Sequence, residues 1–317
     1  MTGTLGHGGR MLAIGECMIE LARRPDGLMA AGFGGDTLNT AVYLARLGVA
    51  VDYGTALGDG DPFSGGMLVA WAAEGVGTER VVRVPGRLPG LYAIETDDAG
   101  ERRFFYWRDR APIRDLFARS EGARLLDGLP GYAMVYLSGI TLAVIGAAGR
   151  TALWPALDKA RAAGTRIAFD SNFRPALWPD LDEAREAYSQ ALARTDLAFP
   201  GMADERAVFG DADADAVAAR VTAAGVAEVV IKLDRPACRV LAAGRDEVVE
   251  APPVAQVVDT TAAGDSFSAA YMAARLDGAD LSVAARAGHR LAGVVIGHRG
   301  AIIPKAATPA LPDLLRP

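Results

Sequence analysis

The sequence predicts an α/β fold in which helices cover both faces of a mostly parallel sheet. Short apolar runs rich in β-branched residues alternate along the chain with longer stretches of helical periodicity. Several of these runs are apolar throughout, which is typical of strands buried on both faces of a parallel sheet. A hairpin pattern at residues 90–109 breaks the alternation and predicts a small additional sheet. With 317 residues, the chain is long enough for one large domain with a full core.

The N-terminal part contains two strand–helix pairs after a loose tail at residues 1–10. The run MLAIG at 11–15 predicts a strand, and LNTAVYLARLG at 38–48 predicts a helix that a glycine ends. The run VDYGTAL predicts the next strand. Asp61 is a suitable N-cap for the helix that follows, with Pro62 at its first position.

The remainder of the chain repeats this rhythm. We expect helices at 149–163, 181–193 and 214–224, and another from near Gly264. Strands are expected at 133–139, 166–170, 196–200 and 228–233, and one more that ends near Val258. Ligands of open parallel sheets bind at the carboxyl ends of the strands, so those ends are where a site is expected.

The segment GLYAIETDDAGERRFFYWRD at 90–109 has two β-rich runs joined across DDAG, which predicts an antiparallel hairpin. Its second run carries arginines and aromatic residues on both faces, so neither face is a simple core or solvent face. A flap that contacts a ligand on one side and a partner subunit on the other explains this pattern. An edge hairpin packed on the main sheet is the alternative.

Composition excludes several classes of function. The net charge is −6 and no basic block occurs, which argues against a nucleic-acid partner. No apolar run approaches the roughly 20 residues that span a bilayer, and the N-terminus lacks a signal-peptide core. Two distant cysteines indicate free thiols in a reducing cytoplasm. Three scattered histidines argue against a histidine metal site or a Ser-His-Asp triad.

Three segments carry candidate chemistry. The chain has no G-x-x-x-x-G-K-[ST] phosphate loop, and GFGGDTLN at 32–39 lacks the third glycine of a dinucleotide fingerprint. That segment exposes backbone at Gly34 and Gly35, with Asn39 one helical turn later, so a ligand hydroxyl can approach the main chain. A simple turn is the alternative for the two glycines.

The second segment, AFDSNFRP at 168–175, follows a predicted strand and crowds Asp170, Asn172 and Arg174 at its carboxyl end. Arg174 is suited to bind a phosphate or carboxylate bidentately, although a surface salt bridge explains it as well.

The third segment is VVDTTAAGDSFSAAY at 257–271. Its side-chain-poor turn can direct successive amides toward an anion at a helix N-terminus. Asp265, in the first turn, is suited to accept a proton from an attacking hydroxyl as a general base. A carboxylate that only complements the helix dipole is the alternative.

The sequence DTTAAGDSFSAAY closely resembles the C-terminal signature of the ribokinase-like (PfkB) sugar kinases. The sequence GGDTLNTAVYLARLG resembles their N-terminal signature, more than 200 residues away and in the expected order. The resemblance covers the chain from Met11 to about Pro304. Within this family, IGECMIEL, RLPGLYAIETDDAGERRFFYWR and FDSNFRPALW resemble the bacterial kinases of 2-dehydro-3-deoxygluconate.

This resemblance implies a ribokinase-like three-layer sandwich, a single kinase domain over 11–317 with a small β-sheet lid formed by about 16–36 and 88–110. It implies ATP and Mg²⁺ as cofactors and leaves open whether a monovalent cation is also needed. The implied reaction is transfer of a phosphoryl group to the 6-hydroxyl of the sugar acid. The apolar-aromatic face of the flap predicts a homodimer through the lid or a higher homo-oligomer, and the free thiols predict a cytoplasmic enzyme. The implied site residues are Asp265 as catalytic base; Ala262, Ala263 and Gly264 as anion hole; Gly34, Gly35, Asn39, Tyr92, Tyr106, Arg108 and Arg174 for the substrate; Asn172, Lys232, Ala262 and Gly264 for the nucleotide; and Glu205 as an indirect metal contact.

Three positions depart from the family pattern. The loop after Lys232 has Asp234 and Pro236 where relatives have a glycine-bearing loop. FPGMADERA lacks the asparagine of the Asn-x-x-Glu motif, for which Asp204 or Glu205 could substitute. Ala301 stands where some relatives have an acidic residue.

Several alternatives stay open. A kinase of the same family can act on fructose, ribose, a nucleoside or a galactonate-type keto-deoxy acid. A non-catalytic sugar-binding regulator and, more remotely, a dinucleotide oxidoreductase are the candidates from other classes. The sequence does not fix the preferred epimer or the oligomeric state.

Overall fold

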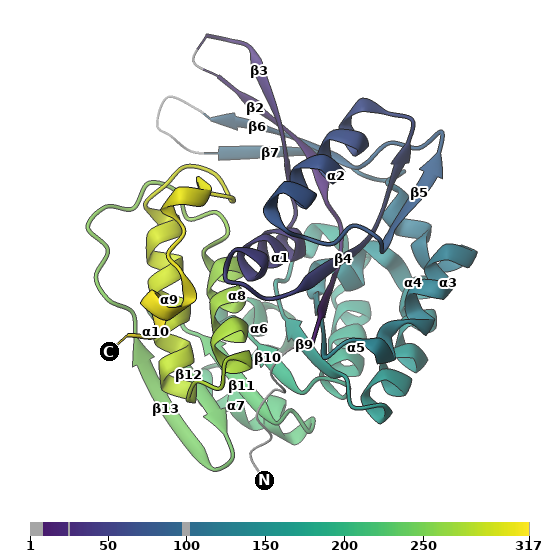
Figure 1. The fold of residues 1–317 in the computed structure, drawn as a ribbon. Coiled ribbons are helices and arrows are strands. Elements are labelled where there is room, and N and C mark those ends of the chain that lie inside the picture. The colour runs from purple at the N-terminus through teal and green to yellow at the C-terminus, as the bar shows by residue number, and fades with distance from the viewer. Residues whose placement is uncertain (1–8, 25, 97–101, 317) are drawn as a thin grey trace.

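The structure is a computed structural model, and it describes residues 9–24, 26–96 and 102–316. Two sheets organise the chain, a large one through its centre and a small one that projects from one end (Figure 1). The turn DDAG of the predicted hairpin and residues 1–8 of the predicted tail lie outside the described residues. Arg10, the last residue of the predicted tail, pairs with Asp52 at 2.6 Å.

The large sheet has nine strands in the order β13-β12-β11-β10-β9-β8-β1-β4-β5. The strands from β11 to β5 pair in parallel, and β12 and β13 extend the β11 edge as an antiparallel hairpin. Their bounds are β1 Met11–Ile14, β4 Val51–Asp59, β5 Val81–Pro85, β8 Met134–Ser138, β9 Arg166–Asp170, β10 Leu197–Phe199, β11 Glu228–Lys232, β12 Ala237–Ala242 and β13 Arg245–Glu250.

The small sheet has four strands in the order β3-β2-β6-β7, and we call it the lid. The strands are β2 Met18–Arg23, β3 Met29–Gly34, β6 Leu91–Thr96 and β7 Arg102–Trp107. The β2–β3 and β6–β7 pairs are antiparallel, and β2 and β6 join them in parallel. The predicted hairpin is therefore half of a separate sheet and is not an edge of the main one.

Helices cover both faces of the large sheet, as predicted, because alternate strand residues enter two separate buried clusters. Met11 and Ala13 of β1 pack with the helices on one face, whereas Leu12 and Ile14 pack with those on the other. The first cluster contains α1 Asp36–Arg46, α2 Pro62–Glu74, α8 Ala263–Leu276, α9 Leu281–Ile296 and α10 Leu311–Leu315; the second contains α3 Ser120–Asp127, α4 Gly139–Ala162, α5 Leu181–Leu192, α6 Met202–Phe209, α7 Ala214–Ala223 and the 3₁₀ segment Pro112–Ala118.

Helix α4 is longer than predicted. A capping box at Ser138 begins it ten residues earlier than the expected start, and the chain kinks at Gly146. By length and composition α4 is the one helix in the described chain that could cross a membrane. Half of its apolar stretch is buried, and it connects two strands of the main sheet, so its apolar character is that of a core crossover helix.

Most predicted elements are confirmed. The strands at 166–170 and 228–232 and the cap that Asp61 gives to Ser64 N at 2.8 Å are present. Both cysteines are free and buried. The expected strand ending near Val258 is wrong: Val257 and Val258 are exposed and belong to no strand. In the sequence, an apolar pair in an exposed loop looks the same as the end of a strand. Only the structure shows that no neighbouring strand pairs with these residues.

Candidate active site

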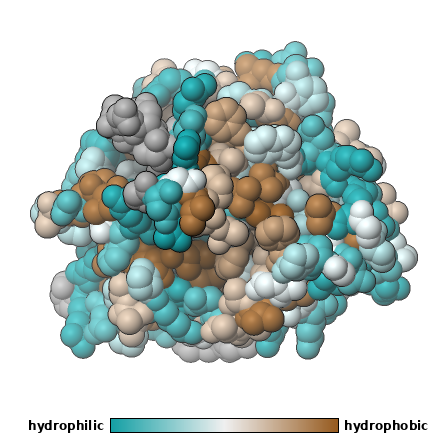
Figure 2. Space-filling view, turned by 90° about the horizontal axis from the view of Figure 1, so that it is seen from above, coloured by the Kyte–Doolittle hydropathy of each residue, from teal (hydrophilic) through white to brown (hydrophobic). Residues whose placement is uncertain are grey.

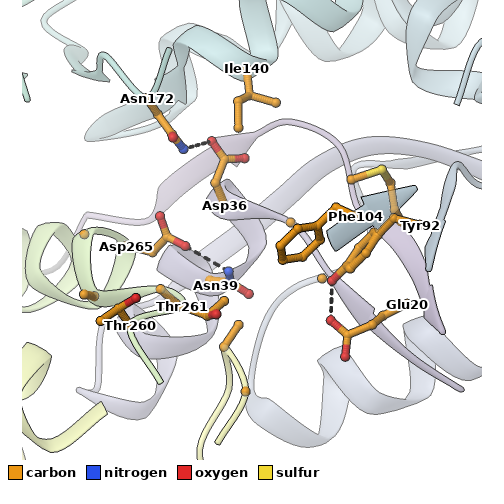
Figure 3. A pocket seen from close by; sticks show the side chains of 18 of the residues that line it. Glu20, Asp36, Asn39, Tyr92, Phe104, Ile140, Asn172, Thr260, Thr261 and Asp265 are labelled. Carbon is orange, nitrogen blue, oxygen red and sulfur yellow. Dashed lines mark hydrogen bonds between the residues drawn. The ribbon is translucent and has the colours of Figure 1, made fainter. Parts of the chain in front are cut away.

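A cleft of about 820 Å³ lies between the lid and the carboxyl ends of the main-sheet strands. The segments that line it come from β2, β3, β6 and β7 of the lid, from the start of α1, from the ends of β9 and β11, and from the loop that enters α8 (Figure 3). Of the residues predicted to form the site, the following line this cleft: Gly34, Gly35, Asn39, Tyr92, Tyr106, Asn172, Arg174, Lys232, Ala262, Ala263, Gly264 and Asp265. Segments more than 200 residues apart in the sequence therefore meet in one site.

Asp265 lies in the first turn of α8 at the edge of the cleft. Asn39 of α1 donates a hydrogen bond from Nδ2 to Asp265 Oδ2 at 2.9 Å (Figure 3). Burial and the nearby negative charges of Asp36 and Asp170 raise the pKa of Asp265 to about 8, against the lowering effect of Asn39 and Lys232. A carboxyl with a pKa near the working pH is suited to accept a proton from a bound hydroxyl.

A second carboxylate, Asp36, lies at the start of α1 and also lines the cleft. Asn172 donates from Nδ2 to Asp36 Oδ2 at 2.8 Å. Burial raises the pKa of Asp36, and hydrogen bonds from Ser138, Thr37 and Asn172 oppose this effect. The bond from Asn172 links the end of β9 to the start of α1, so it fixes the position of Asp36 relative to the sheet.

The turn that enters α8 presents amides to the cleft. Ala262 caps the helix in the left-handed conformation, with φ at 60°. The amide of Ala263 bonds to Thr260 O at 3.2 Å. Gly264 and Asp265 are in the first turn, where amides have no preceding helical carbonyl to bond. Together with the positive end of the helix dipole, this turn is suited to hold an anion.

The conformation of Ala262 supports a stability prediction. A left-handed conformation costs a residue other than glycine about 1–2 kcal/mol. Glycine avoids this cost, but on folding it loses about 0.5–1 kcal/mol more conformational entropy than alanine does. We therefore expect Ala262→Gly to increase the free energy of unfolding by about 0.5–1 kcal/mol, measured by urea denaturation. The matched control is Ala263→Gly, one residue later and inside α8, which should lower the stability by a similar amount. Equal effects of the two substitutions would show that Ala262 is not strained.

Polar residues at the ends of β9 and β11 form the opposite wall. Lys232 Nζ donates to Asp170 Oδ2 at 2.6 Å, and Ser268 Oγ donates to the same oxygen at 3.0 Å. Asp204, at the start of α6, accepts a bond from Ser171 Oγ at 3.1 Å. Burial and the charge of Asp170 raise the pKa of Asp204.

The structure places Glu205, the predicted metal contact, away from the cleft. It is buried and pairs with Arg220 at 2.5 Å, whereas Asp204 lines the cleft. Successive residues of a helix point about 100° apart, so only one of the two can face the site. Within the described residues, no three His, Cys, Asp or Glu side chains are grouped so that they could hold a metal ion.

Two glycines at the end of β3 allow close contact between the lid and the core. A Cβ atom on Gly34 would lie 2.3 Å from the hydroxyl of Tyr92, and one on Gly35 would lie 2.1 Å from Glu16 O. Neither position can carry a side chain without displacing its neighbour. Glycine is therefore required at both positions by these close contacts, and a turn alone does not explain the pair.

Two lid residues predicted to bind the substrate are paired with acidic residues of the chain. The hydroxyl of Tyr92 donates to Glu20 in β2. Arg108 is buried and pairs with Glu16, so it is not among the residues that line the cleft. Arg108 Nε and Glu16 Oε1 are buried without a hydrogen-bond partner in the described chain. Arg174, by contrast, is exposed at the cleft and donates to Phe173 O at 2.8 Å.

Sequence analysis missed several residues that line the cleft or support it. Asp36 follows a glycine pair and precedes a predicted helix, and acidic residues are common at this position for helix stability alone. Its local pattern therefore did not single it out. Glu20 lies between apolar residues of β2, Ile19 and Leu21. No local signal pointed to the others. The missed residues are Glu16, Glu20, Asp36, Ile140, Thr260 and Arg299.

Comparison with known families decides the assignment. Residues 9–308 match the model of the "pfkB family carbohydrate kinase". The chain belongs to the pfkB family of carbohydrate kinases. The match confirms the predicted family.

Known members resemble the whole chain. The 2-dehydro-3-deoxygluconokinase of Dickeya dadantii is 47% identical over 305 residues, which cover 94% of this chain and 97% of that protein. The solved 2-dehydro-3-deoxygluconokinase of Thermotoga maritima is 21% identical, covers 98% of each chain and has a TM-score of 0.84. A ribokinase II-like protein of Escherichia coli, solved with ATP and Mg²⁺, is 23% identical, covers 96% of this chain and 97% of its own, and has a TM-score of 0.82. The two solved structures confirm the ribokinase-like fold.

Proposed function

We propose that this kinase transfers a phosphoryl group from ATP to the 6-hydroxyl of 2-dehydro-3-deoxygluconate. The observation that carries the proposal is the position of Asp265 in a cleft, beside a turn whose amides are suited to hold an anion. The 47% identity to the Dickeya dadantii enzyme supports the choice of substrate. Residues 11–317 form one kinase domain in this proposal, of which the lid is a part.

Asp265 acts as the general base in the proposed reaction. It accepts the proton of the 6-hydroxyl as the oxygen attacks the terminal phosphorus of the nucleotide. Asn39 orients the carboxylate through its bond to Oδ2. The amides of Ala262 and Gly264 stabilise the negative charge on the transferred group, and the amide of Ala263 would join them only by sharing the proton that it gives to Thr260 O. The sugar acid lies between Asp265 and the lid, against Gly34 and Gly35, with Tyr92, Tyr106 and Arg174 as further contacts. Arg108 is buried against Glu16 and would have to leave that pair to reach the substrate.

The nucleotide lies on the opposite side of the turn. Lys232 and Asn172 border that part of the cleft and supply a cation and an amide for phosphate oxygens. Mg²⁺ would shield the phosphate charges; it usually binds through one or two carboxylates together with substrate phosphates. Asp170 and Asp204 both line the cleft here, and Asp170 already pairs with Lys232. Asp204 therefore fits this role better than Glu205, which does not line the cleft.

An activity screen tests the proposal. The purified chain is incubated with ATP, Mg²⁺ and a panel of sugar acids and neutral sugars, and ADP release is measured in potassium and in choline salts. We expect the highest kcat/KM with 2-dehydro-3-deoxygluconate. A preference for fructose or ribose would favour the neutral-sugar alternative. Sugar binding without turnover of any substrate would indicate a non-catalytic regulator.

The pH dependence of kcat/KM gives an independent prediction. The base must be ionised, so kcat/KM should rise with pH and level off above the pKa of Asp265, which is about 8. The charge of Asp36 raises this pKa, so Asp36→Asn should move the midpoint of the rise to lower pH. Asp61→Asn, at the cap of α2 and outside the cleft, is the control. An unchanged midpoint in Asp36→Asn would contradict the coupling of the two carboxylates.

We also propose a cytoplasmic homodimer that forms through the lid. The view onto the lid side of the molecule shows hydrophobic residues gathered near the middle of this face (Figure 2). On β7, Phe104, Phe105, Tyr106 and Trp107 are all at least 40% exposed. An exposed aromatic strand is a typical protein contact. Light scattering of the purified chain tests the dimer, and Trp107→Glu should shift it toward monomer.

A further inference from the structure

Four residues form a row across the cleft-facing side of the lid. Glu20 of β2 is opposite Gly32 on β3 and Tyr92 on β6, and Tyr92 is opposite Tyr106 on β7. Directly opposite residues of neighbouring strands project from the same face. Glu20, Tyr92 and Tyr106 line the cleft, as does Ile94, two residues beyond Tyr92. The row therefore faces the cleft.

Within the row, Tyr92 gives its only proton to Glu20. The hydroxyl donates to Oε2 of the carboxylate (Figure 3). Burial and the charge of Glu20 raise the pKa of Tyr92 well above its usual range, so the phenol keeps this proton. What Tyr92 then offers to the cleft is the lone pairs of its oxygen. A tyrosine in this state accepts hydrogen bonds and has no donor left for a carboxylate.

The second carboxylate oxygen of Glu20, Oε1, is also able to accept a hydrogen bond. Gly32 is its neighbour on β3, and a Cβ atom there would lie 3.6 Å from Glu20 Oε1, in ordinary contact. The described residues donate no hydrogen bond to Oε1. An ionised carboxylate is an acceptor only. Glu20 and Tyr92 thus form a pair of acceptors side by side, and we call them the acceptor pair.

The acceptor pair lies away from the reacting end of the cleft. In Figure 3, Asn39 lies between Asp265 and the pair. Tyr92 also contacts the backbone at Gly34, at the end of β3. A substrate whose 6-hydroxyl is at Asp265 therefore brings a more distant part of its carbon chain to the pair.

We propose that the acceptor pair of Glu20 and Tyr92 binds the 4-hydroxyl of the sugar acid and so selects between the C-4 epimers. This inference rests on the proposed function. A hydroxyl has one proton, which it can donate to either acceptor of the pair or share between them, whereas the acid group of the substrate is repelled by Glu20. The carboxylate of the substrate consequently binds elsewhere, toward the arginines, and Tyr92 is a hydroxyl contact rather than a carboxylate contact. A site built to hydrogen-bond a hydroxyl rejects an analogue that presents it wrongly, because its buried polar groups are then left unpaired.

The test compares Glu20→Gln, Tyr92→Phe and the double variant on 2-dehydro-3-deoxygluconate and its C-4 epimer, 2-dehydro-3-deoxygalactonate. Wild type should discriminate between the epimers by at least about tenfold in KM. Each single variant should raise KM for the preferred epimer by about 10- to 100-fold, with kcat within about threefold. The two epimers should then have nearly equal KM. The double variant should be no worse than the singles, because both residues act on one hydroxyl.

The matched control is Glu95→Gln, an exposed carboxylate on β6 that does not line the cleft. It should leave both KM values unchanged. Thermal unfolding of each variant reports on the fold, and if Glu20→Gln does not fold, Tyr92→Phe carries the test. An equal rise in KM for both epimers, or no discrimination by wild type, would overturn the inference. Failure of wild type to phosphorylate either acid would instead refute the proposed function on which it rests.

Discussion

Asp265→Asn is expected to lower kcat by about 10²- to 10⁴-fold, because it removes the general base of the proposed reaction. The substituted amide has nearly the same shape and keeps an oxygen to accept the hydrogen bond from Asn39 Nδ2. The turn at Ala262, which is suited to hold the anion, does not depend on the carboxylate. Binding of the sugar acid and of ATP should therefore survive, within about tenfold in Kd.

The direction in which Asp265→Asn changes the stability of the fold can be predicted. The folded-state pKa of Asp265, about 8, is above the value of about 3.9 in an unfolded chain. The folded protein therefore binds more protons than the unfolded one between these values, and its stability falls as pH rises through that window. Asparagine does not ionise, so Asp265→Asn should be more stable than wild type at pH 8.

Three measurements check this variant: kcat by ADP release, Kd by calorimetry, and Tm at pH 5 and pH 8. The matched control is Asp277→Asn, which changes an acid at the other end of α8 and should leave kcat unchanged. Activity of Asp265→Asn within tenfold of wild type would refute its role as the base. Loss of binding together with kcat would show that Asp265 is instead a binding residue.

The fold and the turn that enters α8 were predictable because their signals are local. The strand at 166–170 is a continuous apolar run, and the cap at Asp61 depends on residues three positions apart. The turn at 260–264 combines small residues with a helix start, so its chemistry can be inferred without knowing what packs against it. Strand β3 was missed because its residues are mostly small and exposed, which gives no apolar alternation to detect.

The partners of the lid residues were not predictable, because they depend on pairing between distant segments. Glu20 faces Tyr92 only through the register of β2 with β6, across 72 positions of the sequence. A shift of one residue would turn either side chain to the other face. The choice between Asp204 and Glu205 likewise depended on which side of α6 faces the cleft, and a lone sequence does not reveal that for an eight-residue helix.

The pairing of Arg108 with Glu16 changes what a substitution at Arg108 can show. Both side chains are less than 10% exposed, and burial raises the pKa of Glu16 while Arg108 opposes that shift. Arg108→Ala leaves a buried carboxyl without its partner and should lower the free energy of unfolding by about 3 kcal/mol. The same change should raise KM for the sugar acid by about 10- to 100-fold, through loss of a charged contact to its carboxylate.

These two effects can be separated by a compensating change at Glu16. Glu16→Gln removes the unpaired charge, so the double variant Glu16→Gln/Arg108→Ala should regain most of the stability that Arg108→Ala loses. If Arg108 contacts the substrate, the double variant keeps the high KM for the sugar acid and has an unchanged KM for ATP. If Arg108 only holds the lid in place through Glu16, KM for the sugar acid recovers together with Tm. Denaturation and kinetics on the same three proteins therefore distinguish a substrate-binding arginine from a structural one.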